Sequence, residues 1–333
     1  MPKKQYNYIT VLRLIAILMV IVLHCICEYY YDFSNAGRGL WHLLGYADEL
    51  MRTGVPLFFM ISGFLLLKDD ITDIKGFYKK RILKVGIPFI VYDVFYYVFS
   101  YFDGNSISVA GFFRDLLNNG SSYHFWFVYS IIFIYLLMPF LQKIVKNCSL
   151  KMLWLLVILA TFQTTIRPFI NTICDGKLYM FITDDGFMGY IGYVILGYIL
   201  GSYDFNKKSR WLIYALGILT FVAMPAVNMH HIKAEGSHFL TGGYAINHYI
   251  EAMAIFIWFK YNVHSCNKFT ARLSALSFSA YLIHVFILDR LVPISFDLAP
   301  SAVMLIWIAL TCILSFGWGY IESIVTGLFK KNK

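Results

Sequence analysis

Long apolar stretches recur along this chain with little sequence between them. A run of about twenty apolar residues can cross the hydrocarbon core of a bilayer as a helix. Charged residues make up only 14% of the chain, whereas soluble domains contain about a quarter, so a water-soluble globule is excluded. We predict ten spans, at residues 9–28, 48–67, 85–102, 123–142, 152–169, 186–203, 211–228, 244–261, 275–291 and 302–328.

The distribution of basic residues tests the orientation, because Lys and Arg accumulate in cytoplasmic loops. With the N-terminus inside, twenty of the 28 Lys and Arg residues fall in inner segments, seven in outer segments and Arg13 within the first span. Removing one middle span would reverse every later loop and destroy this asymmetry. The predicted fold is an all-α polytopic transmembrane helical bundle of about ten spans. It forms a single domain, 1–333, with both termini cytoplasmic. The net charge of +9 then reflects orientation, and no nucleic-acid partner is needed to explain it.

Ionisable side chains inside a bilayer are costly and mark functional positions by default. The candidates are Arg13, His24, Asp93, Glu251, His284 and Glu322. Arg13 and His24 are eleven positions apart, which places them about 16 Å apart along a helix and within roughly 20° of one face. The alternative is that Arg13 reaches the inner head groups and His24 is a hydrogen-bonded core residue. We expect Asp93 and His284 to be hydrogen-bonded residues of the bundle.

Metal-binding patterns are not evident. The six cysteines form no CxxC pair and predict no disulfide framework. The outer histidines match no zinc spacing and are joined by no cysteine or carboxylate cluster in the sequence. These histidines are His230, His231, His238 and His248. We therefore predict no metal, and these side chains are left as possible walls of an acceptor cleft.

The segment RLIAILMVIVLH, from Arg13 to His24, resembles the hallmark of the membrane-bound acyltransferase family 3: an Arg, ten residues and a His in the first span. Later segments resemble other patterns of that family, in the same order. These segments are GVPLFFMISGFLLL (54–67), FYKKRILK (77–84), HFWFVYSIIFIYLLMPFL (124–141), SAYLIHVFIL (279–288) and GYIES (319–323). The ordered combination covers nearly the whole chain. It is most similar to the stand-alone surface-polysaccharide O-acetyltransferases, which lack a fused esterase-like domain.

The resemblance implies a cytoplasmic acyl-CoA donor, acetyl-CoA first, and no metal cofactor. A basic inner surface of Arg81, Lys84 and Lys68, together with Lys79 and Lys80, suits the phosphates of coenzyme A. Lys79 and Lys80 have the alternative role of enforcing topology alone. Lys84 stands where relatives usually carry a second Arg, and it lacks the bidentate fork of a guanidinium. Arg13 is expected to hold the buried part of the donor. The pantetheine arm is then expected to run outwards along the Arg13–His24 face, through one shared cavity, and to deliver the thioester near His24.

The resemblance also implies roles in the chemical step. Imidazole titrates near neutral pH, so His24 is suited to accept the proton of an attacking hydroxyl, and an acyl-imidazole intermediate stays open. Trp126 begins the fourth span at a similar depth and is either an oxyanion donor, a sugar-stacking ring or an interfacial anchor. Glu322 lies at about the depth of Arg13. We predict an ion pair between them, serving either catalysis or structure alone.

The predicted function is an O-acyltransferase of the bacterial inner (plasma) membrane that modifies a hydroxyl of an envelope polysaccharide or its lipid-linked precursor. Its expected partners are acyl-CoA, this glycan and membrane lipid. The alternative is a secondary transporter or exporter of a glycan or small anion. Paired broken helices and a half-to-half repeat would indicate that alternative, and neither is evident. The sequence does not distinguish acetyl from a larger acyl group, and it defines neither the sugar hydroxyl nor the oligomeric state.

Overall fold

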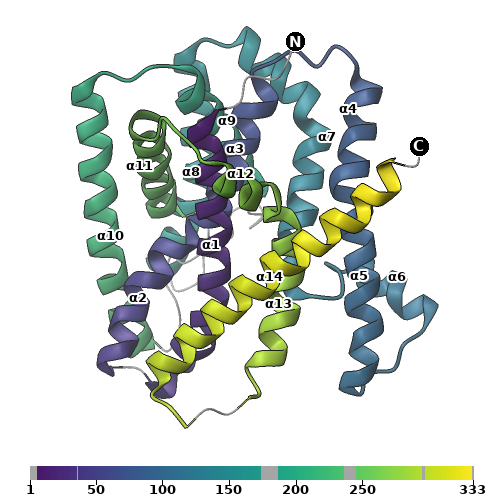
Figure 1. Ribbon diagram of the computed structural model, residues 1–333. Helices are drawn as coiled ribbons and strands as arrows, with labels where there is room; N and C mark the ends of the chain where they lie inside the picture. The colour runs from purple at the N-terminus through teal and green to yellow at the C-terminus, as the bar shows by residue number, and fades with distance from the viewer. Residues whose placement is uncertain (1–5, 36, 174–186, 236–244, 295–296, 332–333) are drawn as a thin grey trace.

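The computed structural model describes residues 6–35, 37–173, 187–235, 245–294 and 297–331, and every regular element within them is helical (Figure 1). The α-helices are α1 (Asn7–Tyr30), α2 (Gly39–Arg52), α3 (Gly54–Leu67), α4 (Ile74–Arg81), α5 (Ile87–Phe99), α6 (Val109–Leu117), α7 (Trp126–Asn147), α8 (Leu150–Ile173), α9 (Phe187–Ser202), α10 (Lys207–Glu235), α11 (Ile246–Asn262), α12 (Lys268–Ala275), α13 (Ser277–Leu291) and α14 (Pro300–Lys331). A π-helical turn, Ile82–Gly86, joins α4 to α5.

Each predicted span is mostly helical where the structure describes it, although 48–67 covers the end of α2 and all of α3. Within the described residues, six helical stretches are long and apolar enough to cross a membrane, and a seventh arises if α12 and α13, bent by 63°, count as one. The six are Asn7–Tyr30, Gly39–Leu67, Ile74–Asp103, Tyr123–Asn147, Lys207–His231 and Pro300–Gly327. The prediction of an all-helical, multi-pass membrane protein is thus confirmed. The count of ten spans and the cytoplasmic position of both termini stay predictions.

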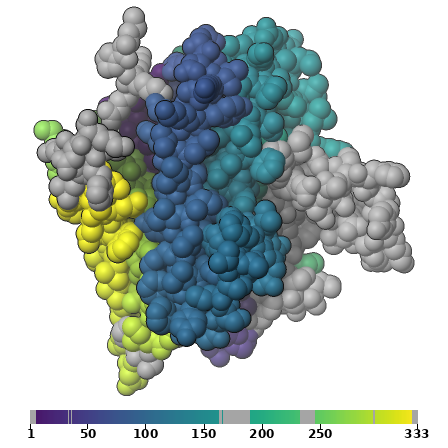
Figure 2. Space-filling view, turned by 90° about the vertical axis from the view of Figure 1, so that its right-hand side faces the viewer, coloured from purple at the N-terminus to yellow at the C-terminus, as the bar shows by residue number. Residues whose placement is uncertain are grey.

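The outward surface of the bundle carries large apolar side chains. Ile218 and Leu219 on α10 are 64% and 61% exposed, and Leu305 and Ile313 on α14 are each 67% exposed. Contiguous apolar surface of this kind is unfavourable in water and suits contact with hydrocarbon. Figure 2 shows a second outer face, where α4, α5 and α6 lie between α14 on one side and α7 on the other.

Helix α1 occupies the centre of the bundle and contacts α2, α3, α11, α12, α13 and α14 (Figure 1). Its residues Leu12, Ile17, Ile21 and Cys25 are fully buried. A helix that is apolar on all faces is covered either by protein or by lipid. Half of the apolar window of α1 is buried by its neighbours, and His24 meets His284 of α13 while Arg13 lines a cavity between helices.

Helices α3 and α9 approach each other closely through reciprocal glycines. A Cβ added to Gly63 would overlap the backbone of Val194, and one added to Gly197 would overlap the backbone of Met60. Small residues at helix crossings let membrane helices pack backbone to backbone, where dispersion replaces the hydrophobic effect as the main attraction. This contact holds α3, which forms one wall of the cavity described next.

Candidate active site

A cavity of about 260 Å³ lies between α1, α3, α7, α13 and the π-helical turn. Its charged lining residues are Arg13, Arg81 and Lys84, and no carboxylate stands among the described residues that line it. Most of the other lining residues are apolar, including Leu65 and Ile131. Three cations in a low-dielectric pocket attract an anion strongly. Three of the four predicted donor-binding residues are therefore brought together.

The local backbone explains how the two cytoplasmic-loop cations enter this lining. Arg81 is the last residue of α4, and its guanidinium lies 4.9 Å from the ring centre of Phe77 and 5.3 Å from that of Tyr135. Stacking of this kind orients the guanidinium while leaving its N–H groups to bind anions. Lys84 lies in the π-helical turn, and such turns recur at functional sites because the extra residue redirects the side chains.

Lys68, the fourth predicted donor-binding residue, does not line the cavity. Its ammonium group donates to the hydroxyl of Tyr6 and lies 4.7 Å from the centre of that ring. The exposed Lys79 and Lys80 are not in the lining either. Lys68, Lys79 and Lys80 are near Arg81 and Lys84 in the sequence. The sequence alone therefore did not show which of these basic residues line the cavity.

His24 forms a hydrogen-bonded pair with His284, with Nδ1 of His24 2.8 Å from Nε2 of His284. Nδ1 of His284 lies 2.6 Å from the carbonyl oxygen of Tyr281, so it must carry the proton that this carbonyl accepts. A neutral His284 then has an unprotonated Nε2, which accepts from Nδ1–H of His24. The remaining nitrogen of His24, Nε2, is thereby the unprotonated one, which is the form required of a general base or nucleophile.

The prediction for His284 is confirmed in that the side chain is fully buried and hydrogen-bonded. Its partner, however, is the candidate catalytic residue, so its position bears on the chemistry. Asp93 is also buried and hydrogen-bonded, since one carboxylate oxygen accepts from the backbone N–H of Ser121 at 2.6 Å.

One continuous cavity from Arg13 to His24 is not present. The described residues that line the cavity include Arg13 but not His24. Tyr281 lines the cavity, and its ring centre lies 5.1 Å from that of Phe127, another lining residue, and 5.5 Å from that of His284. The spacing along α1 sets only the direction of two side chains, whereas neighbouring helices decide what fills the space between them. Tyr281 therefore belongs both to the cavity lining and to the surroundings of the histidine pair, because its carbonyl oxygen accepts from His284.

Aromatic and imidazole rings surround the histidine pair. The ring of Tyr123 lies 5.5 Å from that of His24, and the ring of His124 lies 5.1 Å from that of His284. His124 is buried, and its Nδ1 lies 2.8 Å from Oγ of Ser122. Sequence reasoning missed Tyr123 and His124. Their position beside Trp126, at the start of a span expected near His24, was the available signal.

Trp126 itself stacks on Tyr190, with ring centres 5.5 Å apart and planes inclined by 29°. Its predicted role beside His24 stays a prediction, since the described ring contacts of His24 are with Tyr123 and His284. Trp126 is the first residue of α7, and its alternative roles as a sugar-stacking ring or an interfacial anchor also stay predictions.

The expected ion pair between Arg13 and Glu322 is not formed, and that prediction was wrong. Among the described residues no ion pair includes either side chain. Glu322 instead accepts a hydrogen bond of 2.8 Å from the hydroxyl of Tyr92, which accepts one of 2.7 Å from the indole of Trp318. Helix α14 runs obliquely across the bundle (Figure 1), and its Glu322 meets Tyr92 of α5. Similar depth in two spans does not imply that two side chains face each other.

A separate group of buried ionisable side chains lies between α2 and α11. His248 meets Glu49 and Glu251 there, and the ligand atoms of the three residues lie within 4.8 Å of one another. Sequence reasoning had placed His248 with the other outer histidines, of which His238 lies outside the described residues. His230 and His231 lie on α10 and are not members of this group.

Comparisons with known proteins extend these observations. The family model described as an acyltransferase domain, of the acyltransferase 3 type, matches residues 6–322. The chain is similar to two proteins named as probable poly-beta-1,6-N-acetyl-D-glucosamine export proteins of Staphylococcus aureus. Identity is 23% for strain MSSA476 and 24% for strain MRSA252, each over 304 residues that cover 87% of this chain and 84% of the relative.

A further match is to an amino-acid racemase of Enterococcus faecalis, with 25% identity over 231 residues, or 66% of this chain. The aligned part is 31% of that longer protein. The search of solved structures gave no significant match. The family match includes α1 with Arg13 and His24, the residues of the cavity and most of α14. The chain therefore belongs to the acyltransferase 3 family and is a membrane acyltransferase.

Proposed function

We propose that the protein is an O-acyltransferase of the bacterial plasma membrane. It moves an acyl group, acetyl in the simplest case, from cytoplasmic acyl-CoA to a hydroxyl of an envelope polysaccharide or its lipid-linked precursor. The observation that carries this proposal is a cavity with three cations, Arg13, Arg81 and Lys84, that ends beside a histidine pair. The cations suit a polyanionic donor, and the pair suits proton transfer.

The cavity assigns the parts of the donor to different residues. A volume of about 260 Å³ is below the roughly 300–1,000 Å³ usual for ligand sites, so it suits the acyl-bearing arm and not a whole coenzyme A. The phosphates then stay at the mouth, on Arg81 and Lys84. Arg13 binds deeper, and the apolar walls contact the uncharged arm. The thioester reaches His24 when the side chains of Phe127 and Tyr281 move apart.

The proposed chemistry uses Nε2 of His24. As the acceptor hydroxyl oxygen forms a bond to the thioester carbonyl carbon, Nε2 takes its proton. The C–S bond then breaks, and the imidazolium returns the proton to the leaving thiolate, which yields the ester and free coenzyme A. In the alternative route Nε2 attacks first and carries the acyl group itself. Both routes need an unprotonated Nε2, which His284 secures by accepting from Nδ1–H.

The names of the staphylococcal relatives favour a second candidate, export of a glycan. The cavity argues for acyl transfer, because a passage for a polysaccharide needs polar walls along its length whereas these walls are largely apolar. Acyl transfer to a glycan during its export would agree both with the acyltransferase family and with the export function named for the relatives.

The test uses purified protein in lipid nanodiscs with radiolabelled acetyl-CoA and an oligosaccharide of β-1,6-linked N-acetylglucosamine. Wild-type protein is expected to release free coenzyme A only when the glycan is present and to add label to the glycan. His24→Ala should abolish both signals, and His264→Ala, at an exposed histidine, should abolish neither. A parallel reaction with succinyl-CoA identifies the acyl group.

Two results would contradict the proposal. One is His24→Ala protein that retains full transfer. The other is wild-type protein in liposomes that moves the oligosaccharide across the bilayer without consuming any acyl-CoA, a result that would favour the exporter.

A further inference from the structure

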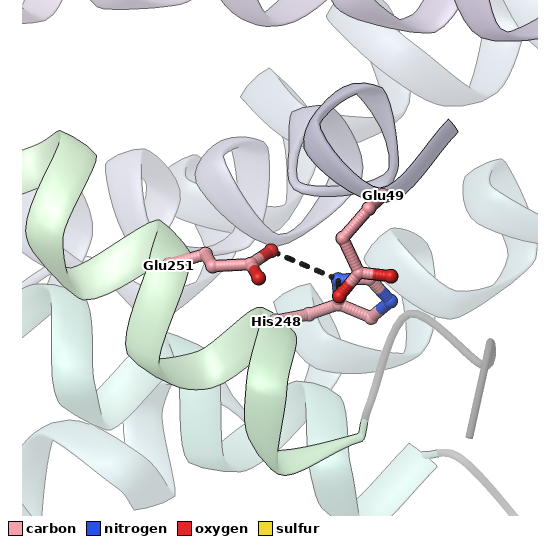
Figure 3. Close-up of side chains that lie close together, drawn as sticks. All are labelled: Glu49, His248 and Glu251. Atoms are coloured by element: carbon pink, nitrogen blue, oxygen red, sulfur yellow. Dashed lines mark ion pairs between the residues drawn. The ribbon is translucent and has the colours of Figure 1, made fainter. Parts of the chain in front are cut away.

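A buried cluster of Glu49, His248 and Glu251 lies outside the site described above. Their exposed fractions are 1%, 0% and 3%, so solvent does not hydrate either carboxylate. Glu49 comes from α2, and His248 and Glu251 lie one helical turn apart on α11. Figure 3 shows both carboxylates turned toward the same edge of the imidazole.

The separations suit ligands around a single ion. Nδ1 of His248 lies 3.4 Å from Oε2 of Glu251 and 3.9 Å from Oε1 of Glu49. Zinc–ligand bonds of about 2.0–2.1 Å at tetrahedral angles place neighbouring ligand atoms about 3.4 Å apart. The two distances from the imidazole nitrogen are close to this value, and all three ligand atoms lie within 4.8 Å of one another, so the carboxylates would have to move closer to meet one ion and a fourth position would be left for water or another ligand.

The charges of the cluster also call for a cation. Among the described residues, neither Glu49 nor Glu251 forms an ion pair with a Lys or Arg. Arg52, the neighbouring cation on α2, is engaged by Asp48 at 2.7 Å. Neither carboxylate oxygen of Glu251 accepts a hydrogen bond within the described part of the chain. Two carboxylates in a low-dielectric interior are neutralised either by a nearby positive charge or by bound protons, and a divalent cation would do so while also satisfying the oxygens of Glu251.

The arrangement in sequence and space is one that helical bundles use for metals. A His and a Glu separated by three positions on one helix, with a Glu from a facing helix, project inward together. A mixed set of imidazole and carboxylate ligands suits Zn²⁺ and neighbouring transition metals. A divalent ion would balance the two carboxylates completely.

We propose that Glu49, His248 and Glu251 bind one divalent transition-metal ion, which joins α2 to α11. Zn²⁺ is the expected occupant from the ligand types. The ion bridges segments that are about 200 positions apart in the sequence, as the hydrogen bond from Asn247 to Glu49 already does. This proposal does not depend on the acyltransferase function.

The experiment measures the metal content of protein purified in detergent without a histidine tag. Protein stripped with a chelator is incubated with Zn²⁺, dialysed and analysed by inductively coupled plasma mass spectrometry, and a second series uses Mn²⁺. Wild-type protein is expected to retain a single zinc ion per chain. Glu49→Gln and Glu251→Gln each remove a ligand, so affinity should fall by more than the 10–100-fold typical of losing an outer-shell partner.

Glu28→Gln is the matched control, because it removes an exposed carboxylate near the end of α1 and should leave zinc content unchanged. A second measurement distinguishes the loss of a metal ligand from misfolding of the variant. Zn²⁺ should raise the Tm of stripped wild-type protein and leave the Tm of stripped Glu251→Gln protein unchanged. The proposal is overturned if folded wild-type protein retains neither metal and shows no shift in Tm, which would mean that protons neutralise the cluster.

Discussion

Replacing His284 tests the proposed role of the histidine pair most directly. His284→Leu keeps a side chain of similar size but removes the nitrogen that accepts from Nδ1–H of His24 at 2.8 Å. Without that acceptor, no hydrogen bond stabilises the His24 tautomer that is protonated on Nδ1. The tautomer that is protonated on Nε2 then becomes populated. That tautomer cannot accept a proton from the acceptor hydroxyl, so kcat should fall.

The magnitude follows from the hydrogen bond that is lost. A buried donor without a partner costs about 1–3 kcal/mol. Since each 1.36 kcal/mol is a factor of ten in rate, kcat should fall about 5–150-fold. The KM for acyl-CoA should change little, because His284 does not line the cavity that is proposed to bind the donor. His284→Gln places an amide oxygen near the same position and should recover part of the loss.

The assay is the glycan-dependent release of coenzyme A, with kcat and KM measured separately and Tm recorded for each variant. A purely structural role for His284 would lower Tm and the amount of active protein without a selective rescue by Gln. The reasoning is refuted if His284→Leu retains kcat within twofold of wild type. It is also refuted if Gln and Leu variants with equal Tm have equal kcat.

Two further predictions concern the cavity and the packing of its wall. Arg81→Gln removes a charge-assisted contact worth about 1.5–3 kcal/mol, so the KM for acyl-CoA should rise about 10–150-fold while kcat stays nearly unchanged. Lys79→Gln is the control because Lys79 lies outside the lining, and equal KM values in the two variants would count against the cavity as the donor site. Gly197→Ala places a methyl group against the backbone of α3 and should destabilise the protein by about 1–3 kcal/mol. Gly317→Ala on α14 meets nothing within 4 Å and should not lower Tm, since alanine favours a helix over glycine. Equal losses of Tm in the two variants would contradict the close α3–α9 contact.

Periodic and compositional features were readable from the sequence. Apolar runs indicated helical spans because a bilayer demands both length and internal backbone hydrogen bonding. The positions of Arg13 and His24 on one helix followed from helical geometry, since both belong to the same element. The basic loop before the third predicted span pointed to Arg81 and Lys84, and both line the cavity. These inferences hold because they depend on residues within one helix or one loop.

Contacts between distant segments depended on the tertiary structure alone. The bond between His24 and His284 joins residues 260 positions apart, and the pairing of Tyr92 with Glu322 joins residues 230 positions apart. Such contacts are set by the rotation and tilt of each helix against its neighbours, and the periodicity of a single uniformly apolar helix does not encode either quantity. For that reason the sequence revealed which ionisable residues lie in the bundle. Only the packing decided that Glu322 meets Tyr92, that Tyr281 contacts both the cavity and His284, and that Glu49 meets His248 and Glu251.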